Sequence, residues 1–138
     1  MLSNALNFKE IHYAHIPLIH DIEGKKLSKR DNITNVEDYL NDGYLAASIF
    51  NFIIKLGNNF NDIEYLNIDE AVKNFNLSKT VLSPAKFDIE KLNFINQFYL
   101  KDLSFSDFNK YLERDVKNQV SSFKLEPIYK DILNRCHK

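Results

Sequence analysis

The fold is decided by residues 45–56, which read LAASIFNFIIKL and precede Gly57. Apolar side chains recur through this segment at helical spacing, so the pattern predicts a helix from Leu45 to Leu56 that ends at Gly57. Because apolar positions surround most of this helix, we expect it to be buried at the centre of the domain. These positions are Leu45, Ile49, Phe50, Phe52, Ile53, Ile54 and Leu56.

Helix start signals flank the central segment on both sides. Thr34 followed by Glu37 is a capping-box pattern, which predicts a helix through Leu40 that Gly43 ends. Other capping residues or a proline predict four more helices: from Asn67 with Glu70 through Phe75, from Asp88 along Ile89, Leu92, Ile95 and Tyr99, from Ser104 or Ser106 over residues 105–120, and over residues 127–136. Residues 77–87 are predicted to be a connector.

Residues 11–19 predict a strand, because they alternate imperfectly and are rich in β-branched and aromatic side chains. Pro17 cannot donate a hydrogen bond to a neighbouring strand, so the strand is expected to be short or at an edge. The predicted fold class is therefore mainly α, with a small β element at the N-terminus.

Composition excludes several classes of function. The 138 residues carry a net charge of −1, so any binding of nucleic acid must depend on local patches. The one cysteine excludes an internal disulfide and a cysteine-rich zinc site. No apolar run has the length of a bilayer span, so we expect no membrane partner.

A basic loop precedes the first predicted helix. Residues 25–30 read KKLSKR and bring four cations and one hydroxyl group within six positions. Lysine is a flexible point charge and arginine a planar fork, and both suit phosphate oxygens. The hexapeptide alone is also typical of a solvated loop, a localisation signal or a phosphorylation site. The residues around it favour a catalytic loop.

The loop and its surroundings resemble the second signature of class I aminoacyl-tRNA synthetases. That signature is usually written KMSKS, and in glutamyl-tRNA synthetases it commonly reads KLSKR, as residues 26–30 do here. HIPLI at 15–19 precedes it, and the resemblance continues with the same spacing over about residues 2–101. Later matching segments are VEDY at 36–39, GYL at 43–45, SPA at 83–85, FD at 87–88 and KL at 91–92.

The resemblance implies roles for four residues of the loop. Lys29 matches the lysine that contacts the ATP phosphates and assists the departure of pyrophosphate, so it is the main catalytic candidate. A cation there stabilises the charge that develops on the leaving group. Lys26 is the second catalytic candidate, expected to support the loop or the phosphates. Ser28 and Arg30 complete the expected ATP-binding set, and arginine is usual at this place in glutamyl-tRNA synthetases.

The resemblance also implies a domain order. Residues 1–33 would be the C-terminal end of the catalytic domain with the KLSKR loop, residues 34–101 a helical stem-contact region, and residues 102–138 the first helices of an anticodon-binding region. The sequence has no HIGH signature, which the family carries in the first half of its catalytic domain together with the glutamate pocket. We therefore expect an internal fragment of a glutamate–tRNA ligase that is inactive alone.

The implied partners are ATP, with Mg²⁺ carried by the nucleotide in the complete enzyme, glutamate, and the acceptor-stem and inner-elbow side of tRNA. The complete enzyme is expected to be a cytoplasmic monomer, whereas the oligomeric state of this chain stays open. Three alternatives remain: a non-catalytic module derived from a synthetase that binds tRNA or protein, a fragment of the glutamine-specific sister enzyme, and an unrelated helical adaptor.

Other chemistry-bearing residues have structural interpretations. His12, His15 and His20 lack a recognised ligand spacing, so we expect polar side chains of an edge strand and no metal site. Seven aromatic residues could stack bases, but their helical spacing predicts the core: Phe50, Phe52, Phe94, Phe98, Tyr99, Phe105 and Phe108. Three lysines could contact RNA phosphates, although a solvated face is the default for Lys86, Lys91 and Lys101.

Overall fold

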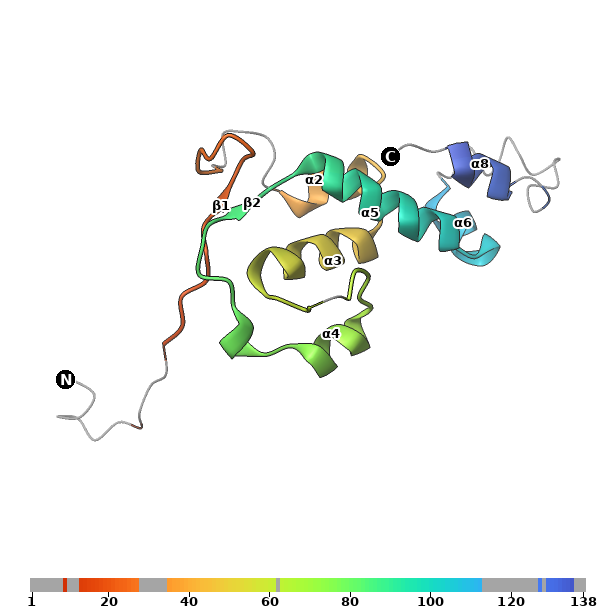
Figure 1. Ribbon diagram of the computed structural model, residues 1–138. Helices are drawn as coiled ribbons and strands as arrows, with labels where there is room; N and C mark the ends of the chain where they lie inside the picture. The colour runs from red at the N-terminus through yellow and green to blue at the C-terminus, as the bar shows by residue number, and fades with distance from the viewer. Residues whose placement is uncertain are drawn as a thin grey trace.

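The computed structural model describes residues 9, 13–27, 35–61, 63–112, 127 and 129–135. The elements are β1 (Ile19–His20), α2 (Val36–Asn41), α3 (Ala46–Gly57), α4 (Ile68–Asn74), the 3-10 turn η1 (Leu77–Lys79), β2 (Ala85–Lys86), α5 (Ile89–Asp102), α6 (Phe105–Tyr111) and α8 (Tyr129–Arg135). This part of the chain is mainly helical with a small β element, as predicted (Figure 1). The second strand of the sheet, β2, and the turn η1 lie in the segment 77–87 that was predicted to be a connector. No helix within these ranges has the length and apolar character of a membrane span.

Helices α3 and α5 lie side by side at the centre of the fold (Figure 1). Between them is the first hydrophobic cluster, whose buried members are Tyr44, Ile49, Phe52, Leu92 and Ile95. Burial of each large apolar side chain of this kind stabilises the fold by about 1.5–3 kcal/mol. The central helix predicted at residues 45–56 is therefore confirmed, with each end shifted by one residue.

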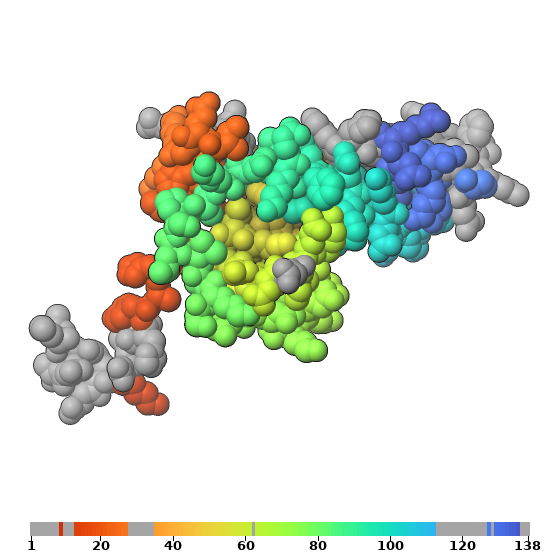
Figure 2. Space-filling model, viewed as in Figure 1, coloured from red at the N-terminus to blue at the C-terminus, as the bar shows by residue number. Residues whose placement is uncertain are grey.

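The burial of α3 is less complete than its sequence predicts. Its buried residues are Ser48, Ile49, Asn51 and Phe52, whereas Ile53 keeps 43% of its surface exposed. The space-filling view shows α3, in yellow, in a recess between α5 and the green segment that follows α4 (Figure 2). The predicted burial of this helix is therefore confirmed on one side only, because the side that carries Ile53 is exposed.

Two smaller clusters hold the remaining helices. The second cluster joins the start of α3 to the ends of α5, α6 and α8 through Leu45, Leu100, Phe108 and Leu133. The third lies beneath the connection from α3 to α4 and contains Phe60, Leu66 and Ala71. The second cluster crosses the domain boundary expected between residues 101 and 102. That boundary stays a prediction.

The strand β1 is much shorter than predicted. It pairs in parallel with β2, with Ile19 opposite Ala85 and His20 opposite Lys86. Residues 13–18 have no regular structure, and residues 11 and 12 lie outside the described residues. Pro17 lacks an N–H donor and Pro84 directly precedes β2, so the ladder cannot extend backward along either strand. The predicted strand is therefore short and at an edge, as expected from Pro17, but the range 11–19 was wrong for residues 13–18.

Most predicted helix caps are observed. The Asn67 side chain accepts a hydrogen bond from the Glu70 N–H at 2.8 Å, and Glu70 accepts from the Asn67 N–H at 3.0 Å, which completes the capping box. Asp88 caps α5, as predicted. Helix α2 differs, because its cap is Asn35 and not the predicted Thr34, which lies outside the described residues. Gly43 follows the end of α2 with φ +93°.

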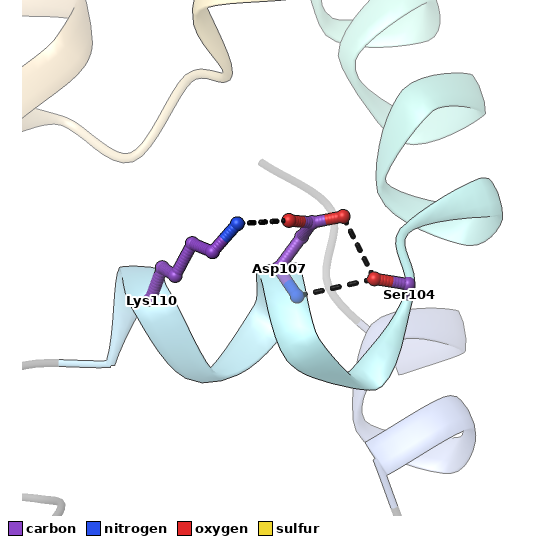
Figure 3. A network of polar contacts seen from close by, with 3 residues as sticks. All are labelled: Ser104, Asp107 and Lys110. Carbon is purple, nitrogen blue, oxygen red and sulfur yellow. Dashed lines mark hydrogen bonds and ion pairs between the residues drawn. The ribbon is translucent and has the colours of Figure 1, made fainter.

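The end of the chain is described only in part, over residues up to 112, residue 127 and residues 129–135. Ser104 caps α6, and Figure 3 shows its hydroxyl beside the Asp107 carboxylate, which accepts from Lys110 at 2.6 Å. This helix ends at Tyr111, because Leu112 packs against the second cluster from an extended backbone. The rest of the predicted range, residues 113–120, lies outside the described residues. Helix α8 covers the middle of the predicted range 127–136.

Candidate functional site

The start of the basic loop is fixed to strand β1 by a tight turn. The Asp21 carboxylate accepts a hydrogen bond from the Lys25 N–H at 2.8 Å, and the Asp21 N–H donates to the Lys25 carbonyl at 2.8 Å. Gly24 has φ +88°, a conformation that side chains with a Cβ rarely adopt. The Leu27 N–H then donates to the Ile19 carbonyl at 3.1 Å. The chain therefore folds back along β1 before the loop continues.

Besides Lys25, two more residues of the basic loop are described. Lys26 is exposed and forms an antiparallel bridge with His20. Leu27 is half-buried and lines the cavity beside the loop, the position expected of a hydrophobic anchor. Lys29, Ser28 and Arg30 lie outside the described residues, so their predicted roles remain predictions.

An apolar cavity of ≈ 410 Å³ lies beside the loop. Its walls come from the segment before the loop, from α2 and α3 and from the residue after β2, and they include Ile16, Pro17, Leu18, Ile19, Val36, Tyr39, Phe52, Ile53 and Phe87. Several of these side chains also face solvent, notably Ile16, which is 81% exposed, and Leu18, which is 55% exposed. Among the described lining residues, Lys26 alone carries a charge. These apolar side chains are grouped around one cavity and are not scattered singly over the surface.

A second cavity, of ≈ 580 Å³, has an acidic wall on the other side of Leu27. It is lined by Asp21, Asp38, Asp42, Asp88 and Glu90, together with Tyr39 and Tyr44. Burial, with smaller contributions from Tyr44, Asp42 and Asp38, raises the pKa of Tyr39 to about 12. A triphosphate would be repelled here, so a polyanion is expected to approach from the side of the basic loop.

The histidines do not form a metal site in the described part of the chain, where no group of metal-ligating side chains is found. His15 is exposed, and His20 lies in β1 with a buried Nδ1 that has no hydrogen-bond partner among these residues. His12 lies outside the described residues.

The aromatic residues divide into core and surface. Phe52 and Phe108 are buried, and Phe50, Tyr99 and Phe105 pack against the hydrophobic clusters, as predicted. Phe94 and Phe98 were wrongly predicted to be core, since they are 58% and 42% exposed.

Helical geometry explains the difference on α5. The buried residues Leu92, Ile95, Asn96 and Leu100 share one face, and residues 94 and 98 fall on the opposite face. The sequence shows this periodicity, but both phenylalanines were assigned to the core because they are apolar. Lys86, Lys91 and Lys101 are all exposed, as a solvated face requires.

Residues 1–94 match the family model described as tRNA synthetases class I (E and Q), catalytic domain. The chain belongs to this synthetase family. The matched range includes the basic loop, both strands, α2 to α4 and the first part of α5.

Relatives of this chain include glutamate–tRNA ligases. A glutamate–tRNA ligase of Francisella philomiragia is 41% identical over 109 residues, which is 79% of this chain and 23% of that protein. Glutamate–tRNA ligase 1 of Nitratiruptor sp. is 44% identical over 115 residues, which is 83% of this chain and 26% of that protein. The chain therefore spans about a quarter of the length of these relatives.

Solved synthetase structures share the fold. A glutamate–tRNA ligase from Elizabethkingia meningosepticum in complex with its amino acid has a TM-score of 0.73 and 27% identity, covering 99% of this chain and 32% of that one. Glutamate–tRNA synthetase from Elizabethkingia anophelis has a TM-score of 0.75 with the same identity and coverage. The likeness to these structures thus extends over nearly all of this chain.

Proposed function

We propose that this chain is an internal portion of a glutamate–tRNA ligase that contributes the KLSKR loop to ATP-dependent activation of glutamate. The observation that carries the proposal is the match of residues 1–94, which include the loop, to the catalytic-domain family of E and Q synthetases. The tight turn between Asp21 and Lys25 supports it, because it fixes the base of the loop to β1.

The chemistry proposed for the loop is electrostatic. Lys29 would contact the ATP phosphates and stabilise the charge that builds on pyrophosphate as it leaves. Lys26 would support the loop or the phosphates, and Ser28 and Arg30 would complete the set that binds the nucleotide. The exposed ammonium of Lys26 fits this role, whereas the acidic wall beyond Leu27 does not fit a phosphate. Mg²⁺ would arrive with ATP and neutralise part of its charge.

The apolar face beside the loop is proposed to pack against the rest of the ligase. Ile16, Leu18, Val36 and Ile53 are exposed here around one cavity, and contiguous apolar surface of this kind marks an interaction site. The missing part would carry the HIGH signature and the glutamate pocket. This division explains why the isolated chain is proposed to be inactive.

The proposed partners, cellular location and domain order are those that the resemblance to the family implies. The proposed partners are ATP, glutamate and the acceptor-stem and inner-elbow side of tRNA, in a cytoplasmic enzyme that is monomeric when complete. Residues 1–33 would end the catalytic domain, residues 34–101 would contact the tRNA stem, and residues 102–138 would begin the anticodon-binding region. The family description covers both E and Q enzymes, and the glutamate specificity of the relatives favours glutamate.

A non-catalytic module that binds tRNA is the second candidate. Its supporting observation is an exposed face of α5 that carries aromatic residues and lysines on the side opposite the core. Such a module would bind RNA without any need for the missing half.

The test replaces the corresponding segment of the Francisella philomiragia ligase with residues 1–94 of this chain. ATP–pyrophosphate exchange is measured with glutamate and tRNA, for the chimera and for the isolated chain. We expect the chimera to catalyse ATP–pyrophosphate exchange. The isolated chain should show no exchange above that of its own Lys29→Ala variant, because it lacks half of the transition-state contacts. Exchange by the isolated chain would contradict the fragment proposal. A folded chimera without exchange would favour the non-catalytic module.

A further inference from the structure

The side chain of Asp21 is the part of the loop base that a substitution can remove. Its carboxylate accepts a hydrogen bond from the Lys25 N–H at 2.8 Å. Two further bonds of the turn join backbone groups. The Asp21 N–H donates to the Lys25 carbonyl at 2.8 Å, and the Gly24 N–H donates to the Asp21 carbonyl at 3.1 Å. Any residue except proline supplies such backbone groups, whereas the carboxylate depends on the identity of residue 21.

The hydrophobic core holds the strand that leads into this turn. The Phe87 N–H donates to the His20 carbonyl at 2.7 Å. Phe87 packs against the first hydrophobic cluster, and its ring lies edge-on to the ring of the buried Phe52, with centroids 5.0 Å apart. Asp21 follows His20 directly, so its backbone is fixed relative to the core before the turn begins.

Lys26 is the residue whose position this turn sets. It follows Lys25 directly, so the two bonds between Asp21 and Lys25 hold the backbone that enters it. On its other side, the Leu27 N–H donates to the Ile19 carbonyl at 3.1 Å. The backbone is therefore held on both sides of Lys26, while the lysine side chain is exposed. A cation on a fixed backbone needs little reorganisation when it meets a phosphate.

Loss of the carboxylate would release the backbone on one side of Lys26. The Lys25 N–H would then turn to water, and the backbone bonds alone would hold the turn. Hydrogen bonds to a charged acceptor are stronger than those between neutral groups, so this loss is expected to be felt. A displacement of about 1 Å at a catalytic group can lower a rate about 10²-fold. The bond of Leu27 to β1 remains, so we expect a smaller effect.

We propose that Asp21 is a positioning residue for adenylate formation, which holds the backbone of Lys26 in place for contact with the ATP phosphates. The inference rests on the proposed function, because Lys26 has phosphates to contact only in the complete ligase. It adds to that function a residue outside the KLSKR loop. Because the Asp21 carboxylate contacts the backbone of Lys25 and no substrate, its effect must pass through Lys26.

The charge of Asp21 offers a second way to influence the site. Asp21 is half-buried and lines the acidic cavity on the other side of Leu27. If only its charge mattered, Asp21 would repel a polyanion, and its removal would make ATP bind more tightly. The positioning role depends instead on an acceptor oxygen, which asparagine also has. The variant Asp21→Asn therefore separates the two roles.

The test measures the pre-steady-state rate of glutamyl-adenylate formation in the chimera described above, which serves as the parent. Asp21→Ala should lower this rate about fivefold to tenfold, without changing the glutamate concentration that gives half of the maximal rate. Asp21→Asn should stay within about twofold of the parent, because the acceptor oxygen is kept. Glu23→Ala is the matched control and should also stay within about twofold, since it removes an exposed carboxylate from the same turn.

A double variant shows whether Asp21 acts through Lys26. In a Lys26→Ala background, Asp21→Ala should slow the reaction by less than about twofold, because the group that it positions is already absent. A general effect on folding would slow both backgrounds equally.

Amide hydrogen exchange in the isolated chain, followed by NMR, tests the structural part of the inference. The Lys25 amide should exchange faster in Asp21→Ala than in the wild type, and it should keep its protection in Asp21→Asn. This measurement does not require an active chimera. Equal exchange in Asp21→Ala and the wild type would show that the carboxylate does not hold the turn.

Three kinetic results would also overturn the inference. They are an Asp21→Ala rate equal to that of the parent, an Asp21→Asn rate as low as that of Asp21→Ala, and an equal effect with and without Lys26. Tighter ATP binding by both variants would assign Asp21 a role through charge instead. An active parent that is insensitive to Asp21→Ala leaves the proposed function standing. A folded parent without adenylate formation contradicts the proposed function and the catalytic part of this inference together.

Discussion

Asn96 caps helix α3 from a position 51 residues away in the sequence. Its Oδ1 accepts hydrogen bonds from the Leu45 N–H at 2.9 Å and from the Ser48 hydroxyl at 2.7 Å. Leu45 is the N-cap residue of α3 and offers no side-chain cap of its own. The buried Asn96 amide on α5 therefore accepts from the Leu45 N–H at the start of α3. This contact fixes how the two central helices are aligned.

Replacing Asn96 with alanine should strongly destabilise the domain. The change leaves the buried Leu45 N–H without its acceptor, whereas the Ser48 hydroxyl keeps the Leu45 carbonyl at 2.7 Å. We expect a cost of about 1–3 kcal/mol in free energy of unfolding. Asn74→Ala is the control, because Asn74 is exposed and makes one local bond to the Glu70 carbonyl. Urea unfolding followed by circular dichroism measures both. A decrease in free energy of unfolding below about 0.5 kcal/mol for Asn96→Ala would show that this cap contributes little to stability.

Gly43 and Gly57 form a matched pair for backbone strain. A Cβ at either position would meet no atom within 4 Å, but only Gly43 has a positive φ, of +93°. We expect Gly43→Ala to lower the free energy of unfolding by about 1–2 kcal/mol and Gly57→Ala to leave it unchanged or slightly higher. Thermal and urea unfolding measure both variants. Equal losses at the two glycines would contradict this account of the turn between α2 and α3.

Stability should fall at high pH because tyrosines are buried. Burial raises the pKa of Tyr39 to about 12, above its ordinary value of 10.0. A pKa that is higher in the folded state gives stability that is complete below pH 10 and is lost as the pH rises toward 12. Tyr39→Phe should therefore make the free energy of unfolding less dependent on pH between about 10 and 12. Tyr111→Phe, at an exposed site, is the control and should follow the wild-type profile.

The features that the sequence predicted correctly are local ones. The capping pairs at Asn67 and Asp88 lie within three residues of the N–H groups that they satisfy, so their spacing alone identified them. The cap that Asn96 provides to Leu45 depends on the packing of α3 against α5, and no local pattern reveals it. The early end of α6 has a similar cause, because Leu112 turns toward a cluster formed by distant helices.

The candidate site was only partly predictable for a different reason. The KLSKR loop was found through its resemblance to a signature, and the structure describes the base of the loop at Lys26 but not Lys29. The exposed positions of Phe94 and Phe98 could have been inferred from helical periodicity relative to Leu92 and Ile95. Their stacking with Tyr65 could not, because Tyr65 reaches α5 from the connection between α3 and α4.

The proposed role of the basic loop, contact with the phosphates of ATP, depends most on Lys29. The measurement is the pre-steady-state rate of glutamyl-adenylate formation in the chimera that carries residues 1–94. Lys29→Ala should lower this rate by about 10²–10³-fold, or about 3–4 kcal/mol, with little effect on glutamate binding. Lys26→Ala should cost less, and Lys29→Arg should restore only part of the rate. Lys79→Ala is the control and should match the wild type. A Lys29→Ala rate within about threefold of wild type, roughly 0.7 kcal/mol, would contradict the assignment of this loop.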